Sequence, residues 1–306
     1  MKALRVHAWG EPPRLETLPH PARLPGHSLV RMRAASVGHI DHTIWGGRFA
    51  LRPPLPYVPG TEAAGEVLEG DRFPPGSRVW LRGGGLGTRR DGCWREVITV
   101  PDEIMGLLPD EVSFDLGAAF FSPCTAAWCA LHDLGRWQPG ERLLITGATG
   151  AVGSIAVQLA RAAGAKVQAV LPTGRVNAVP ADIEAVRLDE LRPEAQLLID
   201  TVGGEVLPGA LRGLAPGGRA VLVGYTAGTE LRLDLPQLML SDVALLPLNM
   251  VRREAAARQL APELLARLAD GRLGLGIEAF PFADGGELLS RLGTHRHAGR
   301  PVLVSG

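Results

Sequence analysis

Apolar residues over 143–146 form a short continuous run that leads directly into a turn with three glycines, Gly147, Gly150 and Gly153. Beyond the turn, apolar residues recur over 152–163 at the three- and four-residue spacing of a helix with one buried face. The pattern therefore predicts a buried strand, a tight turn and an amphipathic helix in direct succession.

The part of the chain before about residue 115 has the pattern of a β-rich domain. Short apolar stretches alternate there with turns rich in glycine and proline, which is typical of strands joined by loops. These stretches are 1–6, 29–32, 63–68, 78–81 and 96–100. A proline-rich segment over 53–60 predicts an extended connection, because proline disfavours helix.

After Asp115 the pattern changes to helices alternating with strands, the order of βαβ units. An alanine-rich segment predicts one helix over 116–134, and largely apolar runs predict parallel strands covered on both faces. These runs are 166–170, 195–200, 219–224 and 245–249. The remaining patterns predict helices over 253–269 and 286–292 and a closing strand over 301–304, which we interpret as a return to the first domain.

The strand, glycine turn and helix together predict a dinucleotide-binding site. Glycines let the backbone approach a pyrophosphate closely, and the free N–H groups at a helix start face it. The residues assigned to this phosphate cradle are Gly147, Ala148, Thr149, Gly150, Ala151, Val152 and Gly153. The alternative is an ordinary tight turn between a strand and a helix. The apolar pattern on both sides of the turn favours dinucleotide binding.

Composition narrows the range of partners and compartments. The chain has 306 residues, enough for two domains, and a formal net charge of zero, which gives no electrostatic reason to bind nucleic acid or an anionic membrane. No apolar run approaches the length of a membrane span, and the first residues have the pattern of a strand, not of a signal peptide. Cys93, Cys124 and Cys129 lack metal-binding spacing and indicate a cytoplasmic protein without disulfides. Lysine occurs only at Lys2 and Lys166.

Several short segments, spread over nearly the whole chain, carry a family resemblance. They are Val-Pro-Gly-Thr-Glu-Ala-Ala-Gly at 58–65, Gly-Cys-Trp-Arg-Glu at 92–96, the three turn glycines, Asp-Thr-Val-Gly-Gly at 200–204, Gly-Gly-Arg-Ala-Val-Leu-Val-Gly at 217–224 and His-Ala-Gly-Arg-Pro-Val-Leu at 297–303. In this order the segments resemble the medium-chain dehydrogenase/reductase superfamily, and within it the zinc-free, zeta-crystallin-like quinone oxidoreductase branch.

The resemblance implies an α/β protein in which a GroES-like β-rich catalytic domain is split around a Rossmann domain with a doubly wound parallel sheet. It places the GroES-like domain at 1–115 and 251–306, and the NADPH-binding Rossmann domain at 116–250. Relatives hold the active site in the cleft between the domains and commonly form homodimers by pairing Rossmann sheet edges. The apolar run 243–246 is a candidate for that edge, but it could equally be a buried strand.

The resemblance also predicts that the chain works without zinc. Zinc-dependent relatives take three ligands from segments in which this chain has Gly38, Thr61 and Ser122, and none of these is a credible zinc ligand. The four-cysteine structural lobe of those relatives is also missing. His39 and His42 are close enough in sequence to leave a chance metal site open, although a catalytic zinc needs three well-placed ligands.

The choice of cofactor depends on the loop about twenty residues after the glycine turn. NAD enzymes place an acidic residue there to hold the ribose 2′-hydroxyl. This chain has Thr173, Gly174 and Arg175, and a hydroxyl with a guanidinium suits the 2′-phosphate of NADPH. The alternative is a plain polar loop with a solvated arginine.

Further contacts to the nicotinamide follow from the resemblance. It assigns them to Gly224, Tyr225 and Asn249 at strand ends, and to the helix start at Thr125. Relatives usually carry a threonine at the position aligned with Ala126, so the threonine is shifted by one residue here.

The substrate pocket departs from the family pattern at two positions. Quinone reductases typically have an asparagine where this chain has Gly38, and often a tyrosine where it has Thr43. His39 and His42 flank Asp41 beside that pocket, and an imidazole titrates in the range suited to a general acid. The alternative is that both are ordinary loop histidines and that Asp41 is structural.

These observations together predict a cytoplasmic, zinc-independent oxidoreductase that passes hydride from NADPH to a quinone or related conjugated carbonyl. Such a transfer needs chiefly proximity and orientation, because water can protonate the delocalised phenolate that forms. One alternative is an alkene or enoyl reductase of the same superfamily. The other is a non-catalytic NADPH-binding relative with a crystallin-like or regulatory role. In each case the expected partner is a small molecule.

Overall fold

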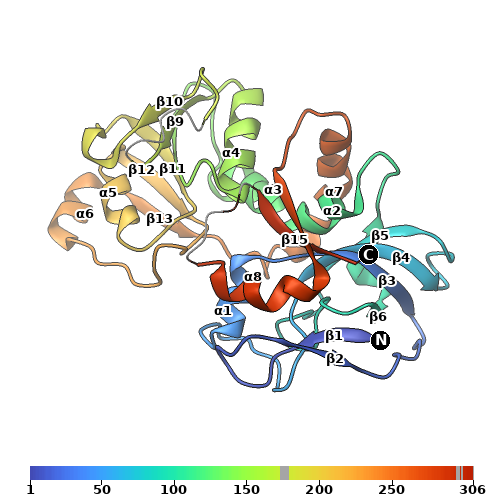
Figure 1. Ribbon diagram of the computed structural model, residues 1–306. Coiled ribbons are helices and arrows are strands. Elements are labelled where there is room, and N and C mark those ends of the chain that lie inside the picture. Colours follow the sequence, from blue (N-terminus) through green and yellow to red (C-terminus); the bar gives the residue numbers. More distant parts are fainter. Residues whose placement is uncertain (173–178, 294–296, 298, 306) are drawn as a thin grey trace. The chain divides into compact units, whose positions relative to one another are not determined.

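Two sheets of different kinds organise the chain, and each belongs to its own unit (Figure 1). The computed structural model describes residues 1–172, 179–293, 297 and 299–305. Unit 1 combines Met1–Phe121 with Leu265–Gly306, and unit 2 is Ser122–Leu264. Both ends of the chain therefore contribute to unit 1, while its middle part forms unit 2.

Unit 1 contains a largely antiparallel sheet in which strands from the two ends of the chain are neighbours. The strands of unit 1 are β1 (Lys2–Arg5), β2 (Arg14–Thr17), β3 (His27–Ser36), β4 (Glu62–Glu69), β5 (Arg78–Arg82), β6 (Val97–Pro101), β7 (Met105–Leu107), β14 (Ile277–Pro281) and β15 (Arg300–Val304). The sheet order is β14-β15-β3-β4-β5-β7, with β6 also paired to β3. β14 and β15 run parallel, and β1 forms a separate antiparallel pair with β2.

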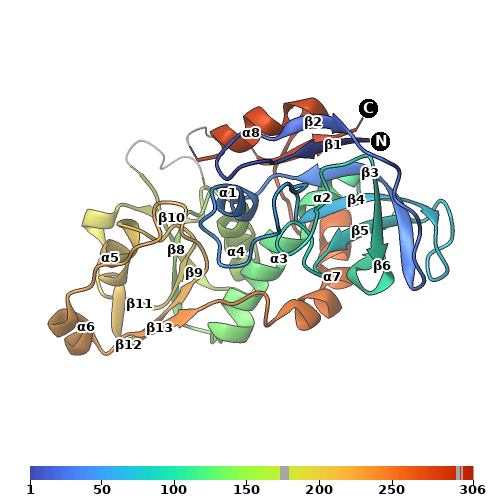
Figure 2. The same ribbon diagram turned by 90° about the horizontal axis from the view of Figure 1, so that it is seen from below.

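Alternating side chains of β3 explain the core of unit 1. Val30, Met32 and Ala34 are buried on one face of the strand, as the two-residue period of a pleated strand requires. Trp94 and Ile98 belong to the same buried cluster as Val30 and Met32. The short helical segments around this core are α1 (His39–Trp45), η1 (Asp102–Ile104), α2 (Phe114–Ala119), η5 (Phe282–Asp284) and α8 (Gly285–Arg291), the last lying beside β1 and β2 (Figure 2).

Unit 2 is a single parallel sheet with helical segments between its strands. The strands are β8 (Arg142–Thr146), β9 (Lys166–Val170), β10 (Glu184–Val186), β11 (Ala195–Asp200), β12 (Leu214–Leu222) and β13 (Ala244–Pro247). The helical segments are α3 (Phe121–Trp128), η2 (Cys129–Leu134), α4 (Ala151–Ala162), η4 (Leu188–Glu190), α5 (Val206–Leu211), α6 (Leu235–Ser241) and α7 (Glu254–Ala269). The first residue of α3 and the last five of α7 belong to unit 1.

The strand order in unit 2 is that of a doubly wound sheet. It is β10-β9-β8-β11-β12-β13, with every described pair parallel. The chain moves outward from β8 to β10, returns to pair β11 with β8, and then moves outward in the opposite direction. Right-handed crossovers therefore place α4 and α5 against opposite faces (Figure 1). The order reverses between β8 and β11, and their carboxyl ends form the crevice in which such sheets bind ligands.

The single helix predicted over 116–134 is wrong, because the segment forms three helical pieces. α2 ends at Ala119, α3 begins at Phe121, and the last piece, η2, is a π-helix. Pro123 has no N–H to donate to the carbonyl of Ala119, so it is tolerated only in the first turn of a new helix. The aromatic rings of Trp80, Phe120 and Phe121 pack together at this break.

A buried network of charges joins three strands of unit 1. The Glu62 carboxylate on β4 binds Arg82 on β5 at 3.1 Å and Arg300 on β15 at 2.7 Å, and its side chain is 2% exposed. Arg300 also donates to the Ser36 hydroxyl at 3.2 Å. Because charges out of water are costly unless they are paired, the carboxylate that these two arginines share is important for the stability of unit 1.

Among the described residues, no helix combines the length and apolar character that crossing a membrane requires.

We expect Glu62→Gln to lower the free energy of unfolding by about 3–5 kcal/mol, because it leaves two guanidinium groups without their carboxylate. Chemical denaturation measures this loss. The matched control is Glu66→Gln on the same strand, whose partner Arg33 is 3.0 Å away in a half-exposed pair. That change should cost less than about 1 kcal/mol. Equal losses in the two variants would contradict the assigned role of Glu62.

Candidate functional site

The glycine turn lies at the point where the strand order of unit 2 reverses. It follows β8 directly, and Gly147 has the positive φ of 62° that only glycine adopts readily. A Cβ on Gly153 would lie 2.1 Å from the Gly147 carbonyl oxygen, so the start of α4 packs against the turn only because residue 153 is glycine. The predicted strand, turn and helix therefore have the geometry of a phosphate-binding turn.

The start of α4 has the properties of an anion-binding helix end. Gly150 precedes the helix, and no side chain caps it, which leaves the first N–H groups of α4 without a side-chain acceptor. Ala148 is buried, whereas Thr149 and Gly150 are exposed at the surface. Among the described residues, a Cβ on Gly150 would meet only the Gly147 carbonyl oxygen, at 3.2 Å, so few described atoms surround this position. These residues fit the pyrophosphate of a dinucleotide.

A buried side-chain network fixes the turn to the loop after β11. The Thr146 hydroxyl donates to the Asp200 carboxylate, which also accepts the Gly203 N–H at 2.9 Å. In return, the Thr201 hydroxyl donates to the Thr146 carbonyl at 2.8 Å. Burial raises the pKa of Asp200, while its hydrogen bonds to Thr146 and to the backbone lower it. The resemblance includes segment 200–204, but sequence reasoning did not assign this network to the site. The feature of the sequence that could have revealed it is an aspartate at the end of an otherwise apolar strand.

The loop after β12 joins the same region. The N–H of Val223 donates to the Asp200 carbonyl at 2.8 Å, and a Cβ on Gly224 would lie 2.2 Å from the Thr201 carbonyl. The structure thus brings Gly224 against the loop after β11. Tyr225, the next residue, is 40% exposed and presents an aromatic ring at the strand ends.

Asn249 and Thr125 occupy different environments. Asn249 follows β13 and is exposed, and its side-chain oxygen accepts the N–H of Arg252 at 3.1 Å. Thr125 lies in α3 and is fully buried. The residues chosen for cofactor discrimination, Thr173, Gly174 and Arg175, lie outside the described residues.

In unit 1, Gly38 and Thr43 lie at the two ends of α1 and offer no free polar side chain. Gly38 precedes the helix, and its N–H donates to Asp41 Oδ2 at 2.9 Å. The Thr43 hydroxyl donates to the His39 carbonyl at 2.7 Å, which satisfies it within its own helix. A Cβ on Gly38 would make ordinary van der Waals contacts with Arg300 and Asp41 at 3.5 Å and with Ile40 at 3.8 Å, so an alanine would fit at this position.

The two candidate histidines on α1 are held in the neutral form. Surrounding protein atoms partly desolvate the His39 ring, which keeps some exposed surface, and lower its pKa; the charges of His42, Arg300 and His297 lower it further. Burial and the nearby Arg48 lower the pKa of His42, whose Nδ1 accepts from Arg48 at 3.3 Å. At neutral pH, therefore, neither imidazole is in the protonated, cationic form that could act as a general acid.

Among the carboxyl groups near α1, Asp41 has the pKa that departs most from its ordinary value. Burial raises its pKa to about 6, with a further contribution from the charge of Glu62. Its hydrogen bond from Gly38 and the charges of Arg300 and Arg82 oppose that shift. Burial, followed by the charge of Asp41, also raises the pKa of the Tyr57 hydroxyl.

Of the three positions aligned with zinc ligands, Thr61 lies in the packed interior, whereas Gly38 and Ser122 are half-buried. Thr61 is fully buried, and the neighbouring Glu62 binds two arginines. Within the residues that the structure describes, no three or more His, Cys, Asp or Glu side chains are grouped so as to hold a metal ion.

Comparison with known proteins assigns both parts of the chain to families. Residues 24–110 match the alcohol dehydrogenase GroES-like domain, and residues 151–268 match the zinc-binding dehydrogenase family. The fold and the glycine turn thus define a GroES-like domain combined with a Rossmann-type dinucleotide-binding domain. The chain belongs to the medium-chain dehydrogenase/reductase superfamily, in its quinone oxidoreductase-like branch.

Curated relatives support this membership. The chain is 30% identical over 253 residues to the quinone oxidoreductase of Rattus norvegicus, covering 76% of this chain and 75% of that one. It is 30% identical over 259 residues to a zinc-type alcohol dehydrogenase-like protein of Schizosaccharomyces pombe, covering 81% and 79%. It is 32% identical over 224 residues to the human synaptic vesicle membrane protein VAT-1 homolog, covering 67% of this chain but only 55% of that protein.

Solved structures show the same architecture. A Pseudomonas syringae quinone oxidoreductase is 25% identical with a TM-score of 0.87, and the match covers 99% of each chain. An oxidoreductase from Salmonella enterica, solved in complex with NADP, is 25% identical with a TM-score of 0.80 over the whole of both chains.

We expect Asp41→Asn to alter the pH dependence of stability. The folded pKa of about 6 lies above the unfolded value of 3.8, so the folded state binds more protons between them, and raising the pH costs stability until the carboxyl is ionised in both states. The free energy of unfolding of the variant, minus that of the wild type, should therefore rise by about 1.4 kcal/mol from pH 5 to pH 8. Urea denaturation across this range measures the difference, and parallel profiles would refute the prediction.

Proposed function

We propose that the protein is an NADPH-dependent reductase of quinones or related conjugated carbonyls that works without zinc in the cytoplasm. The observation that carries the proposal is the glycine turn at the reversal point of a doubly wound sheet, followed by a helix without a side-chain cap. Membership of the quinone oxidoreductase-like branch supports the substrate class, and three buried free cysteines support a reducing compartment.

The residues present fit a dinucleotide. The N–H groups from Ala151 onward would bind the pyrophosphate, and the open surface over Gly150 admits it. Gly224 and Tyr225, which follow β12 beside the loop after β11, would contact the cofactor farther along. For the 2′-phosphate, Thr173 and Arg175 offer a hydroxyl and a cation, an assignment that rests on the sequence. The NADP complex of the Salmonella enterica relative supports the same class of cofactor.

The bound nicotinamide supplies a hydride. The chain contributes binding and orientation, because a quinone reduced by hydride becomes a delocalised phenolate that water protonates. The side chains of α1 are consistent with a reaction in which the chain orients the substrate and water supplies the proton. Thr43 is satisfied within its own helix, and both histidines have lowered pKa values. Gly38 adds no polar side chain that could act on a substrate.

The test measures binding of NADPH and NADH by calorimetry, followed by oxidation of the tighter one with 1,4-benzoquinone and 9,10-phenanthrenequinone. We expect NADPH to bind more tightly and to be oxidised by quinone. Arg175→Ala should weaken NADPH binding by about tenfold and leave NADH binding unchanged, because one charge-assisted contact is lost. The control is Arg187→Ala, which removes an exposed arginine paired with Asp189.

Gly150→Ala separates the phosphate site from the rest of the fold. The added methyl group stands in front of the α4 N–H groups with one tight contact, so we expect weaker binding of both cofactors in a folded protein. Gly209→Ala, in α5 of the same unit, is the matched control.

In the cofactor and quinone experiment, NADPH binding without turnover would refute the proposed quinone reductase activity. It would favour the enoyl reductase or the non-catalytic NADPH-binding protein. Equal weak binding of both cofactors would refute the assignment of Thr173 and Arg175 to the 2′-phosphate of NADPH.

We also propose that the protein is a homodimer formed along β13. This strand pairs with β12 on one side and ends the described order of the sheet on the other. Leu235, Met239 and Leu240 of α6, the element preceding β13, are 63%, 79% and 80% exposed. An uncovered strand edge beside exposed apolar side chains is typical of a surface that pairs with another chain.

Light scattering should give twice the chain mass of 32.4 kDa for the wild type. The double change Met239→Glu and Leu240→Glu should give the single mass, because burying two carboxylates opposes association. Leu107→Glu, at a residue 64% exposed in unit 1, is the control and should leave the dimer intact. A wild type of single mass would contradict the proposed dimer.

A further inference from the structure

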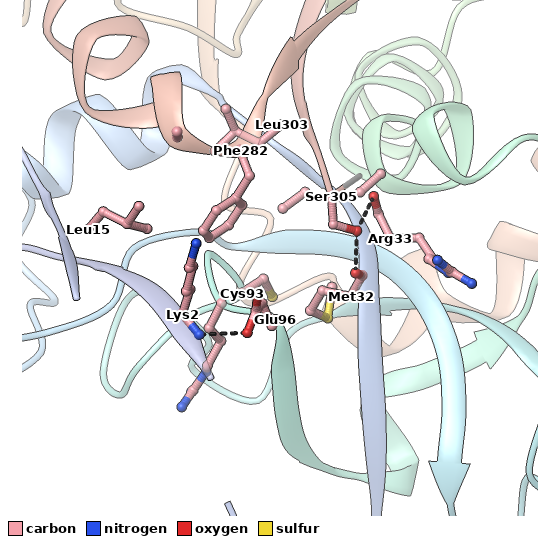
Figure 3. Close-up of a pocket in the computed structure, with 13 residues that line it drawn as sticks. Lys2, Leu15, Met32, Arg33, Cys93, Glu96, Phe282, Leu303 and Ser305 are labelled. Atoms are coloured by element: carbon pink, nitrogen blue, oxygen red, sulfur yellow. Dashed lines mark hydrogen bonds between the residues drawn. The ribbon is translucent and has the colours of Figure 1, made fainter. Parts of the chain in front are cut away.

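The cavity of unit 1 among β1, β3, η5 and β15 has the walls of a packed interior (Figure 3). Cys93 and Leu303 are 0% and 1% exposed there, and Arg95 donates to a backbone carbonyl at 3.0 Å. The Glu96 carboxylate accepts the backbone N–H of Lys2 at 2.6 Å (Figure 3). The described residues that line this cavity therefore assemble no polar site for a ligand, whereas unit 2 contains a connected set of polar contacts.

The segment that leads from β13 to α7 carries Asn249, one of the residues assigned to the nicotinamide end of the cofactor (Figure 2). Asn249 is exposed and follows β13 at the carboxyl edge of the parallel sheet, the edge that also holds the glycine turn. Its side-chain oxygen accepts the N–H of Arg252 at 3.1 Å, whereas its amide nitrogen donates to no described residue. The amide N–H groups are therefore available to the carbonyl oxygen of a ligand.

Arg253 joins this segment to the π-helix η2. Its Nε donates to Asp133 Oδ2 at 2.6 Å, and its Nη1 donates to the Asn249 carbonyl at 3.4 Å. The Arg253 side chain is 23% exposed. A guanidinium presents its donors in a fixed planar fork, so a single group holds a carboxylate and a carbonyl in a set direction. The backbone of Asn249 is thus connected to η2.

η2 is a firm support for this contact. Arg219 of β12 donates to the carbonyls of Gly135 and Arg136, directly after η2, and binds both carboxylate oxygens of Glu141 at 2.7 Å and 2.8 Å. Such two-pronged arginine–carboxylate pairs fix a geometry more strictly than a single hydrogen bond. The end of η2 is therefore held to the sheet, and Asp133 lies within this fixed segment.

The surroundings of the ion pair fit a functional role. Cys129, the first residue of η2, is 4% exposed. Burial raises the pKa of its thiol, the charge of Asp133 raises it further, and the charge of Arg253 lowers it. Both charges therefore act on a buried group at the start of the π-helix. Turns of this kind are rare and occur frequently at functional sites.

We propose that Arg253 is a positioning residue for the nicotinamide end of the cofactor. Anchored on Asp133, it holds the segment after β13 so that the Asn249 amide donates to the carboxamide oxygen of the nicotinamide. Arg253 acts through Asn249 and not by its own contact with the cofactor. The inference rests on the proposed function, which supplies the nicotinamide cofactor, and it adds the residue that orients this end of it.

Calorimetry with two ligands tests the proposal. NADPH is compared with 2′-phospho-ADP-ribose, which lacks only the nicotinamide; if NADH binds more tightly, NADH and ADP-ribose replace them. We expect Arg253→Ala and Asn249→Ala each to weaken binding of the intact cofactor by about fivefold, as for one lost hydrogen bond, and to leave the fragment's affinity unchanged. The double variant should bind the cofactor no more weakly than Asn249→Ala alone, because Arg253 acts through that residue.

Arg142→Ala is the matched control. Arg142 begins β8 at the amino edge of the same sheet and pairs with Glu194 at 3.0 Å. Its loss should leave the affinities of both ligands unchanged. Arg253→Lys keeps the charge beside Asp133 but not the planar fork, so it should show the same selective loss to a smaller degree. The fold of each variant is checked by its thermal transition.

Turnover with 1,4-benzoquinone at saturating cofactor is the second measurement. Arg253→Ala should lower kcat by about tenfold and change the KM for quinone little, because a loosely held nicotinamide is less often aligned for hydride transfer. A wild type that binds the cofactor without turnover would refute the quinone reductase, and the calorimetry would still decide the role of Arg253.

Three results would overturn the positioning role. Equal weakening of the cofactor and the fragment in Arg253→Ala indicates a general loss of the site. Full additivity in the double variant indicates that Arg253 acts independently of Asn249. An unchanged Arg253→Ala beside a selective loss in Asn249→Ala overturns the positioning role alone and leaves the proposed function intact. A wild type that binds neither NADPH nor NADH overturns both.

Discussion

The hydrogen bond between the Thr146 hydroxyl and the Asp200 carboxylate joins the ends of two strands that are far apart in sequence and adjacent in the sheet. Around it, the glycine turn, the loop after β11 and the start of the loop after β12 are held within backbone contact of one another. A phosphate-binding turn works only if its N–H groups keep a fixed direction before the ligand arrives. The buried aspartate provides that rigidity at the cost of desolvating its charge, which is why its remaining acceptor capacity is filled by backbone N–H groups.

In unit 1 the polar groups are used differently. Gly38, Asp41 and Thr43 bind one another or their own helix, and Glu62 is neutralised by two arginines. Thr43 and Glu62 are thus committed to structure, whereas Asp41 keeps a buried Oδ1 without a hydrogen-bond partner among the described residues and has a pKa raised to about 6. A reductase that depends on position more than on acid–base chemistry tolerates such an arrangement, because orientation alone lowers the barrier for hydride transfer substantially. The same commitment explains why a glycine in place of an amide side chain is compatible with the fold.

Sequence reasoning succeeded where one local pattern determines one element. The apolar run, the glycine turn and the helix after it are all present, since β8 and α4 are specified by their own residues. It failed where long-range packing decides. The three-residue strands β7 and β10 are too short to show a period, and β14 was missed because its side chains are only half-buried. Pro123 did signal the break before α3, but the alanine content around it obscured that signal. The Thr146–Asp200 pair depends on which strands are neighbours, and sequence spacing does not reveal this.

The pairing of β15 with β3 has a consequence for the order in which the chain matures. Every strand of unit 2 is complete before β15 leaves the ribosome, so the parallel sheet can form while the antiparallel sheet still lacks a central member. Until then the Glu62 carboxylate lacks the guanidinium of Arg300, which is 238 residues later in the chain, and the edge of β3 over Ala34–Ser36 stays unpaired. The N-terminal segment is therefore the part of the nascent protein most exposed to wrong pairing. β15, the last strand of unit 1, completes the antiparallel sheet. Unit 1 therefore becomes stable only once translation has reached this strand.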